Sequence, residues 1–276
     1  MTQAATVLAG RFRLVNSQVA LYDKIGIGYD TTRRADPFIL SRLLHYLAPV
    51  KGRLYLDVGC GTGNYTAAIS AAGVRIAGID VSRTMLARAH EKSPTLGWYN
   101  ARAEALPFKT ESLAGATCTF VHHHMDDAVA AFREVHRVLH PGSRLVLFNS
   151  TVEQMRHYWL REYFPTSMAQ AAASIERYEA RDALAAASFV VTTVEPYVVR
   201  EDLRDWFLLC GKNRPELYLD PKVRAGISMF TAARDQTEIK RGVDKLRNDI
   251  VSGRIAEVQG RYAWDGGDYT FTVAVR

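Results

Sequence analysis

The chain has 276 residues, of which 48% are hydrophobic and 23% are charged, and Lys and Arg exceed Asp and Glu by 35 to 29. This composition excludes a generally disordered chain, and the length suffices for one large domain or for a domain with a cap. The sequence contains no apolar run approaching the roughly 20 residues that a membrane helix needs, so we expect no membrane association.

The N-terminus lacks the basic start and apolar stretch of a signal peptide. The three cysteines have no metal-ligand spacing, which argues against a disulfide scaffold and against a zinc site. We therefore expect a cytoplasmic protein without a bound metal. The basic residues are scattered, which favours an ordinary solvated surface over a nucleic-acid interface.

Strands and helices alternate over the first half of the chain, which predicts an open α/β sheet with right-handed crossovers. In chain order we expect a helix at 38–48, a strand at 53–58, a helix at 64–72, a strand at 74–79, a helix at 84–91, strands at 96–100 and 116–121, a helix at 129–139, a turn at Pro141-Gly142 and a strand at 144–149. Beyond these, residues 151–187 look helical, 189–199 form a strand, 201–260 look mainly helical with breaks at Pro215 and Pro221, and 269–275 form a last strand.

The strongest local signal is a glycine-rich turn between the first strand and its helix. Residues 56–66 read LDVGCGTGNYT, with glycines at alternate positions. Glycines there let a ligand lie directly on the main chain, and the start of a helix offers unpaired N–H groups. The pattern differs from the G-x-G-x-x-G of dinucleotide-binding folds. A tight turn without a ligand would also need glycines, but Asp80 at the end of the next strand is placed to accept hydrogen bonds from a ribose diol.

Four segments in this order resemble the class I S-adenosylmethionine-dependent methyltransferases, particularly the group of ubiquinone and menaquinone biosynthesis and of natural-product small-molecule methylation. The segments are LDVGCGTG at 56–63, GIDVS at 78–82, AEALPF at 103–108 and EVHRVLHPG at 134–142. They are specific for the fold and the cofactor and say little about the acceptor.

The resemblance implies a Rossmann-like, mostly parallel seven-stranded sheet with helices on both faces, an antiparallel last strand and a helical cap. It divides the chain into an N-terminal lid segment (1–36), a cofactor-binding core (37–150), cap helices (151–188) and C-terminal strands (189–276) with a helical insertion at about 200–262 that completes the cap.

The resemblance also implies S-adenosylmethionine as cofactor, S-adenosylhomocysteine as product, and a set of cofactor contacts. Asp57 and the loop of Gly59, Cys60, Gly61 and Gly63 would hold the methionyl part, Asp80 the ribose, Val81, Met85, Ala103 and Glu104 the adenine, and Phe120 and Val121 the sulfonium side; Tyr22, Tyr29 and Arg34 would close over the cofactor or substrate. The last three residues could equally be anchors of a terminal helix. Relatives often carry Asp where this chain has Arg102, so either Arg102 points outward or the adenine amino group has another partner.

Three consecutive histidines, residues 122–124, follow the fourth strand. His122 and His123 are candidates to take a proton from an attacking oxygen, nitrogen or acidic carbon. Packing or helix capping would explain a histidine here as well, and three neighbouring side chains cannot all point into one site. Methyl transfer itself needs chiefly alignment of the two reactants.

The segments after the strands at 144–149 and 189–199 start on the cofactor side of the sheet, so we expect them to form a cap over the cleft. Its aromatic residues Tyr158, Trp159, Tyr163 and Trp206 are candidate substrate contacts, although core packing would also account for them. We therefore expect a monomeric or homodimeric methyltransferase that acts on an O, N or acidic C atom of a small apolar or aromatic metabolite. Alternatives are a cofactor-binding protein with other chemistry and, less favoured, a nucleic-acid methyltransferase.

Overall fold

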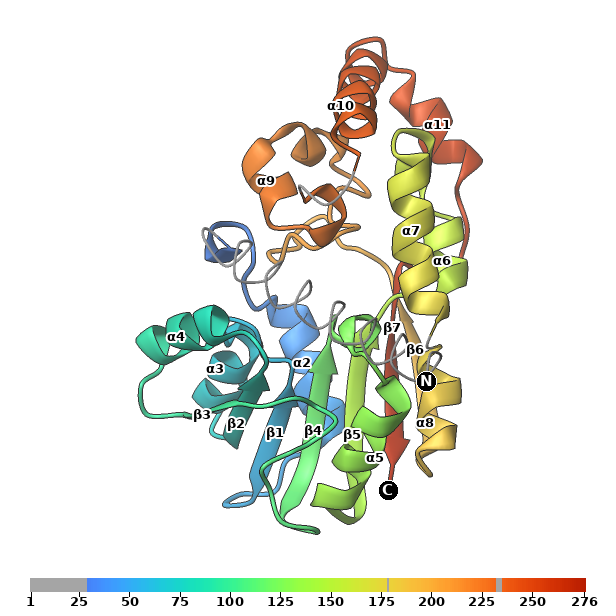
Figure 1. The fold of residues 1–276 in the computed structure, drawn as a ribbon. Coiled ribbons are helices and arrows are strands. Elements are labelled where there is room, and N and C mark those ends of the chain that lie inside the picture. The colour runs from blue at the N-terminus through green and yellow to red at the C-terminus, as the bar shows by residue number, and fades with distance from the viewer. Residues whose placement is uncertain (1–28, 178, 232–234) are drawn as a thin grey trace, which may run out of the picture.

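The computed structural model describes residues 29–177, 179–231 and 235–276. A seven-stranded sheet with the order β3-β2-β1-β4-β5-β7-β6 forms its centre (Figure 1). β7 runs antiparallel to both of its neighbours and the other paired strands are parallel, as expected from the sequence. The strands are β1 (Leu54–Val58), β2 (Arg75–Asp80), β3 (Gly97–Asn100), β4 (Leu113–Thr119), β5 (Leu139–Asn149), β6 (Val190–Tyr197) and β7 (Tyr269–Val275).

Alternating side chains of the strands fill two separate cores, one on each face of the sheet. In β1, Tyr55 belongs to one buried cluster, whereas Leu56 and Val58 belong to the other. This is the two-residue period of a strand that is covered on both faces. Helices α2 (Pro37–Leu47) and α3 (Asn64–Ala71) contribute to the first cluster, and α5 (Ala128–Val138) and α8 (Ala180–Ala186) to the second, while α4 (Arg83–Lys92) packs along β2 and β3.

Short polar side chains begin several of these helices. Asp36 accepts hydrogen bonds from two N–H groups of the first turn of α2, and Pro37 occupies the first helical position, where no N–H is needed. Ser82 caps α4 and Asp127 caps α5 in the same way. These caps fix where each helix starts, just beyond the carboxyl ends of the parallel strands.

The cap rises above the carboxyl ends of the parallel strands (Figure 1). Within the described residues it comprises α6 (Val152–Arg156), α7 (Pro165–Glu176), α9 (Pro221–Ala225), α10 (Gln236–Val251) and α11 (Ile255–Arg261), with 3₁₀ turns η3 (Trp159–Glu162), η4 (Pro215–Leu219) and η5 (Ser228–Phe230). None of the helices in the described part of the chain has the length and apolar character required to cross a membrane.

Three expectations about local structure need correction. Pro141-Gly142 lies within β5 rather than in a separate turn, because the pairing with β4 shifts register between Leu113 and Gly115 and accommodates the extra residues. Pro215 and Pro221 start η4 and α9 instead of breaking a helix, since proline suits the first turn. Residues 201–214 form turns and irregular chain rather than a helix.

The helix α8 also differs from its expected place in the cap. Its buried residues Ala180, Ala183 and Leu184 join the cluster beneath α5, and the helix packs against α5 and β6. An alanine-rich, narrow face suits this close approach to a neighbouring helix and sheet.

Candidate active site

A cavity of about 240 Å³ lies between the carboxyl ends of the strands and the cap. Its floor comes from the segments that follow β1, β2, β4 and β5, and its roof from α7, η5 and the irregular chain at 205–208. This is the crevice beyond the carboxyl ends of the strands, where open α/β sheets bind ligands.

The glycine turn after β1 forms one wall of this cavity. Gly59 and Gly61 have positive φ angles of 70° and 54°. A Cβ atom at Gly59 would lie 2.3 Å from a methyl group of Val121, so the loop can pass β4 only without a side chain there. A Cβ atom at Gly61 would meet nothing within 4 Å, and Gly61 lines the cavity. The bare backbone at Gly61 thus forms a cradle that a side chain would fill.

Asp80, at the end of β2, is held at the cavity by the backbone on either side of it. One carboxylate oxygen accepts the N–H of Gly61 at 2.9 Å, and the other accepts the N–H of Ser82 at 2.8 Å. These two bonds fix the carboxylate beside the glycine cradle, and both Asp80 and Gly61 line the cavity.

Asp57 lies beneath the glycine turn and is 1% exposed. The hydroxyl groups of Thr66 and Thr117 donate hydrogen bonds to its two oxygens at 2.6 and 2.9 Å. Burial raises the pKa of Asp57 to about 6, although these two hydrogen bonds favour the ionised form. The side chain ties α3 and β4 together and borders the cavity.

The N-terminal end of the described chain closes one side of the cavity. Tyr29 lines it, as expected, but Arg34 is exposed and is not among the lining residues; the neighbouring Arg33 lines it instead. The guanidinium of Arg33 donates to both oxygens of Asp205 at 2.6 and 3.3 Å and to the hydroxyl of Tyr29 at 2.8 Å. Tyr22 lies outside the described residues.

Asp205 links this segment to the cap. It is 1% exposed and also accepts hydrogen bonds from the hydroxyl of Tyr65 on α3 and from the backbone N–H of Arg34. Sequence analysis did not identify Asp205 or Arg33, because nothing in the local sequence shows that residues 172 positions apart form an ion pair.

Val81, Met85, Ala103 and Glu104, which the sequence predicts to contact adenine, also line the cavity. Arg102 also reaches the cavity rim, where it donates to Asp126 at 2.6 Å and to Glu104 at 3.2 Å. Arg102 therefore does not point away from the site, and it brings the carboxylate of Asp126 to the rim.

The three histidines form the 3₁₀ turn η2 (His122–His124) and divide between interior and cavity. His123 and His124 line the cavity, whereas His122 is 1% exposed and is not among the lining residues. A 3₁₀ turn separates successive side chains by about 120°, so neighbouring rings cannot share one direction. Burial lowers the pKa of His123 to about 4 and that of His122 to about 3, which leaves both rings neutral near pH 7.

Phe120 and Val121, which connect β4 to η2, line the cavity beside the glycine turn. Phe120 has a positive φ of 57° and its ring packs against Phe207 of the cap, with the centroids 4.6 Å apart. The two halves of the site therefore meet at this aromatic contact.

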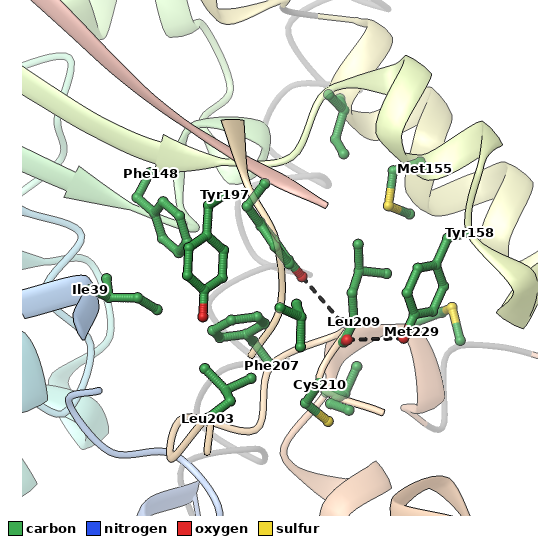
Figure 2. Packing of buried hydrophobic residues seen from close by; sticks show 14 of the residues in the cluster. Ile39, Phe148, Met155, Tyr158, Tyr197, Leu203, Phe207, Leu209, Cys210 and Met229 are labelled. Carbon is green, nitrogen blue, oxygen red and sulfur yellow. Dashed lines mark hydrogen bonds between the residues drawn. The ribbon is translucent and has the colours of Figure 1, made fainter. Parts of the chain in front are cut away.

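The four cap aromatics expected to contact substrate do not line the cavity in the described structure. The hydroxyl of Tyr158 donates to the carbonyl of Leu209 (Figure 2). It also bonds to the hydroxyl of Tyr218, and the hydroxyl of Tyr163 donates to Asp249. Trp159 is 3% exposed within the same cluster, and Trp206 packs against it. These residues build the interior of the cap, which is the core-packing alternative.

Other cap side chains line the cavity in their place. They are mostly aliphatic, aromatic or sulfur-containing: Met155, Ala171, Ile175, Phe207, Ile227 and Met229. Figure 2 shows Met155, Phe207 and Met229 within the same buried hydrophobic cluster, to which they come from different segments of the chain. In the ranges that the structure describes, no group of three His, Cys, Asp or Glu side chains is arranged to hold a metal ion.

Comparison with known proteins identifies the family to which this fold and site belong. A family profile described as a methyltransferase domain matches residues 56–147. A demethylmenaquinone methyltransferase from Geobacillus stearothermophilus is 30% identical over 175 residues, which cover 53% of this chain and 75% of that protein. The chain belongs to the class I S-adenosylmethionine-dependent methyltransferases.

Within this family the chain is similar to proteins that act on small molecules. The O-methyltransferase rstn1 of Aspergillus nomiae is 38% identical over 125 residues, 43% of this chain and 56% of that protein. The matched part thus spans little more than half of that relative. The crystal structure of an Anabaena variabilis protein, described as a methyltransferase from an antibiotic biosynthesis pathway, superimposes with a TM-score of 0.78 at 27% identity, covering 89% of this chain and 99% of that one.

Proposed function

We propose that the chain transfers the methyl group of S-adenosylmethionine to an O, N or acidic C atom of a small, apolar or aromatic molecule. One observation carries the proposal: a single cavity joins the glycine cradle and Asp80 to the apolar side chains of the cap. A cofactor and an acceptor could therefore lie in contact within one partly enclosed space.

The residues present fit the cofactor. The bare backbone at Gly61 leaves room for the methionyl part, the carboxylate of Asp80 is oriented for two ribose hydroxyls, and Val81 and Met85 offer apolar contacts to the adenine. Arg33 takes the place expected for Arg34 and would face the carboxylate end of the cofactor together with Tyr29. When bound, the cofactor supplies a methyl group already activated by its positive sulfur.

The chain itself contributes alignment and exclusion of water. Phe120, Val121 and His123 form the wall between the two halves of the cavity, so they would orient the acceptor atom. The neutral ring of His123 can accept a hydrogen bond or a proton. The capped cavity supports a small acceptor over a nucleic acid.

Calorimetric titration with S-adenosylhomocysteine, followed by incubation of the protein with methyl-labelled S-adenosylmethionine and a set of phenols, quinols and aromatic amines, tests the proposal. We expect binding, and formation of S-adenosylhomocysteine that depends on the added acceptor. Absence of binding would refute the cofactor site. Binding without any methyl transfer would favour the alternative of a cofactor-binding protein with other chemistry.

A further inference from the structure

The cavity wall contains a buried amide oxygen for which the structure provides no hydrogen-bond donor. Asn149, the last residue of β5, is 4% exposed and lines the cavity. Its Nδ2 donates to the carbonyl of Ser150 at 2.9 Å, which fixes the orientation of the amide. Its Oδ1 has no partner among the described residues. A buried polar atom without a partner is destabilising, so such atoms are rare unless a ligand satisfies them.

A second such atom lies on the segment that leaves the neighbouring strand. Nδ1 of His123 is buried and has no partner in the described structure, and His123 lines the same cavity. β4 and β5 pair in parallel up to Thr119 and Phe148, and the N–H of Phe120 donates to the carbonyl of Phe148. The two chains therefore leave the sheet side by side, and Asn149 and His123 belong to one wall.

The rest of the cavity determines what kind of molecule can use these two atoms. The roof is apolar, with Met155, Ile175, Phe207 and Met229 among its residues. Five carboxylate residues line the cavity, against two arginines. Arg33 is paired with Asp205, and Arg102 with Glu104 and Asp126. The carboxylates in this partly enclosed space oppose the entry of an anion.

We infer that Asn149 and His123 form the polar recognition point for an uncharged acceptor, an aromatic or alicyclic ring whose hydroxyl or amino group donates a hydrogen bond to Asn149. Anionic acceptors such as carboxylates and phosphates are excluded by the acidic lining. Asn149 acts here as a positioning residue, because an amide does not titrate and can hold the donor group in one place. This inference rests on the proposed function and specifies the class of acceptor.

Three matched probes test this recognition: 1-naphthol, which carries a donor; naphthalene, which does not; and 1-naphthoate, which is anionic. Their binding to the protein saturated with S-adenosylhomocysteine is measured by calorimetry or fluorescence, for the wild type, Asn149→Leu and Asn248→Leu. Leucine has the same number of side-chain heavy atoms and the same branching as asparagine but no hydrogen-bonding groups, and Asn248 is exposed on α10, outside the cavity.

In the wild type we expect naphthol to bind about tenfold more tightly than naphthalene and naphthoate, as one satisfied buried hydrogen bond provides. Asn149→Leu should reduce the preference for naphthol over naphthalene to about threefold or less without weakening naphthalene, while Asn248→Leu keeps the wild-type preference. A merely structural role of Asn149 would weaken all probes alike.

The inference is overturned if the naphthol preference is the same in Asn149→Leu and the wild type, if naphthoate binds as tightly as naphthol, or if none of the three probes binds. Failure of the proposed function is seen separately, as absence of S-adenosylhomocysteine binding to the wild type. In that case the same three probes are compared on the protein alone, where the same outcomes decide the inference.

Discussion

The cofactor half and the cap half of the cavity are built in different ways. The cofactor half consists of the ends of β1 and β2 and the turns that follow them. There the backbone N–H of Gly61 donates a hydrogen bond to the carboxylate of Asp80. The cap half is assembled from α6, α7, η5 and the chain near Phe207, whose side chains are long and apolar. A rigid, short-range site suits a constant cofactor, whereas side chains from distant segments can change with the acceptor and leave the cofactor site intact.

The buried pair between Arg33 and Asp205 connects the two halves, and breaking it is expected to have the largest effect. Asp205→Leu alone leaves the guanidinium of Arg33, 11% exposed, without its counterion. We expect the free energy of unfolding to fall by about 3–5 kcal/mol, measured by urea denaturation. The double variant Arg33→Met/Asp205→Leu should lose clearly less than the sum of the single changes; additive losses would mean that the pair does not couple the segments.

A side chain at position 61 should weaken cofactor binding by occupying the cavity, and a second glycine outside the cavity controls for the loss of stability. Gly61→Val directs a branched side chain into the cavity, and we expect the affinity for S-adenosylhomocysteine to fall at least 100-fold, about 2.7 kcal/mol. Gly73→Val is the matched control, because Gly73 also has a positive φ, of 89°, and open space around it, but does not line the cavity. It should carry the same backbone strain and keep its affinity; equal loss in both variants would refute the cradle.

The free energy of unfolding should depend on pH through His123, which lines the cavity between its two halves. The folded-state pKa is about 4, below the usual 6.5, so the unfolded chain binds a proton between these values that the folded chain does not. The contribution of His123 to the free energy of unfolding is therefore fully present above pH 6.5 and is lost as the pH falls toward 4. Between pH 8 and pH 5 we expect His123 to contribute a loss of about 2 kcal/mol, in addition to the loss from His122, so His123→Gln should make the total loss smaller by about 2 kcal/mol, measured by urea denaturation at both pH values. An unchanged pH slope would show that His123 is not desolvated.

Asp80→Asn should have the smallest effect of these changes, a modest loss of affinity for S-adenosylhomocysteine. The amide keeps the size of the side chain but loses the charge and one acceptor, so we expect about tenfold weaker binding of S-adenosylhomocysteine, about 1.4 kcal/mol. The acceptor-side probes should retain their relative affinities, because the two backbone N–H groups that hold Asp80 belong to the turns after β1 and β2 rather than to the cap. Calorimetry with the nucleoside and with naphthol distinguishes the two halves; unchanged nucleoside affinity would remove Asp80 from the ribose site.

The predictions from sequence were most accurate for features that a few consecutive residues encode. The strand at 269–275 and the glycine turn at 59–63 were both predicted. Predictions about the direction of single side chains were less successful: Arg33 rather than Arg34 lines the cavity, and His123 and His124 rather than His122 do so. Neighbouring side chains leave the backbone in different directions, and the packing of the surrounding segments decides which of them reaches the cavity.

The amino-acid sequence by itself determined the sheet, the family and the cofactor turn, because periodic burial and closely spaced glycines act over a few residues. The tertiary structure alone decided which cap residues line the cavity. Tyr158, Trp159 and Tyr163 are as apolar in sequence as Phe207 and Met229, yet the first three fill the interior of the cap and the last two line the cavity. Which of two similar side chains is enclosed depends on the packing of segments far apart in the chain, and local sequence does not encode this.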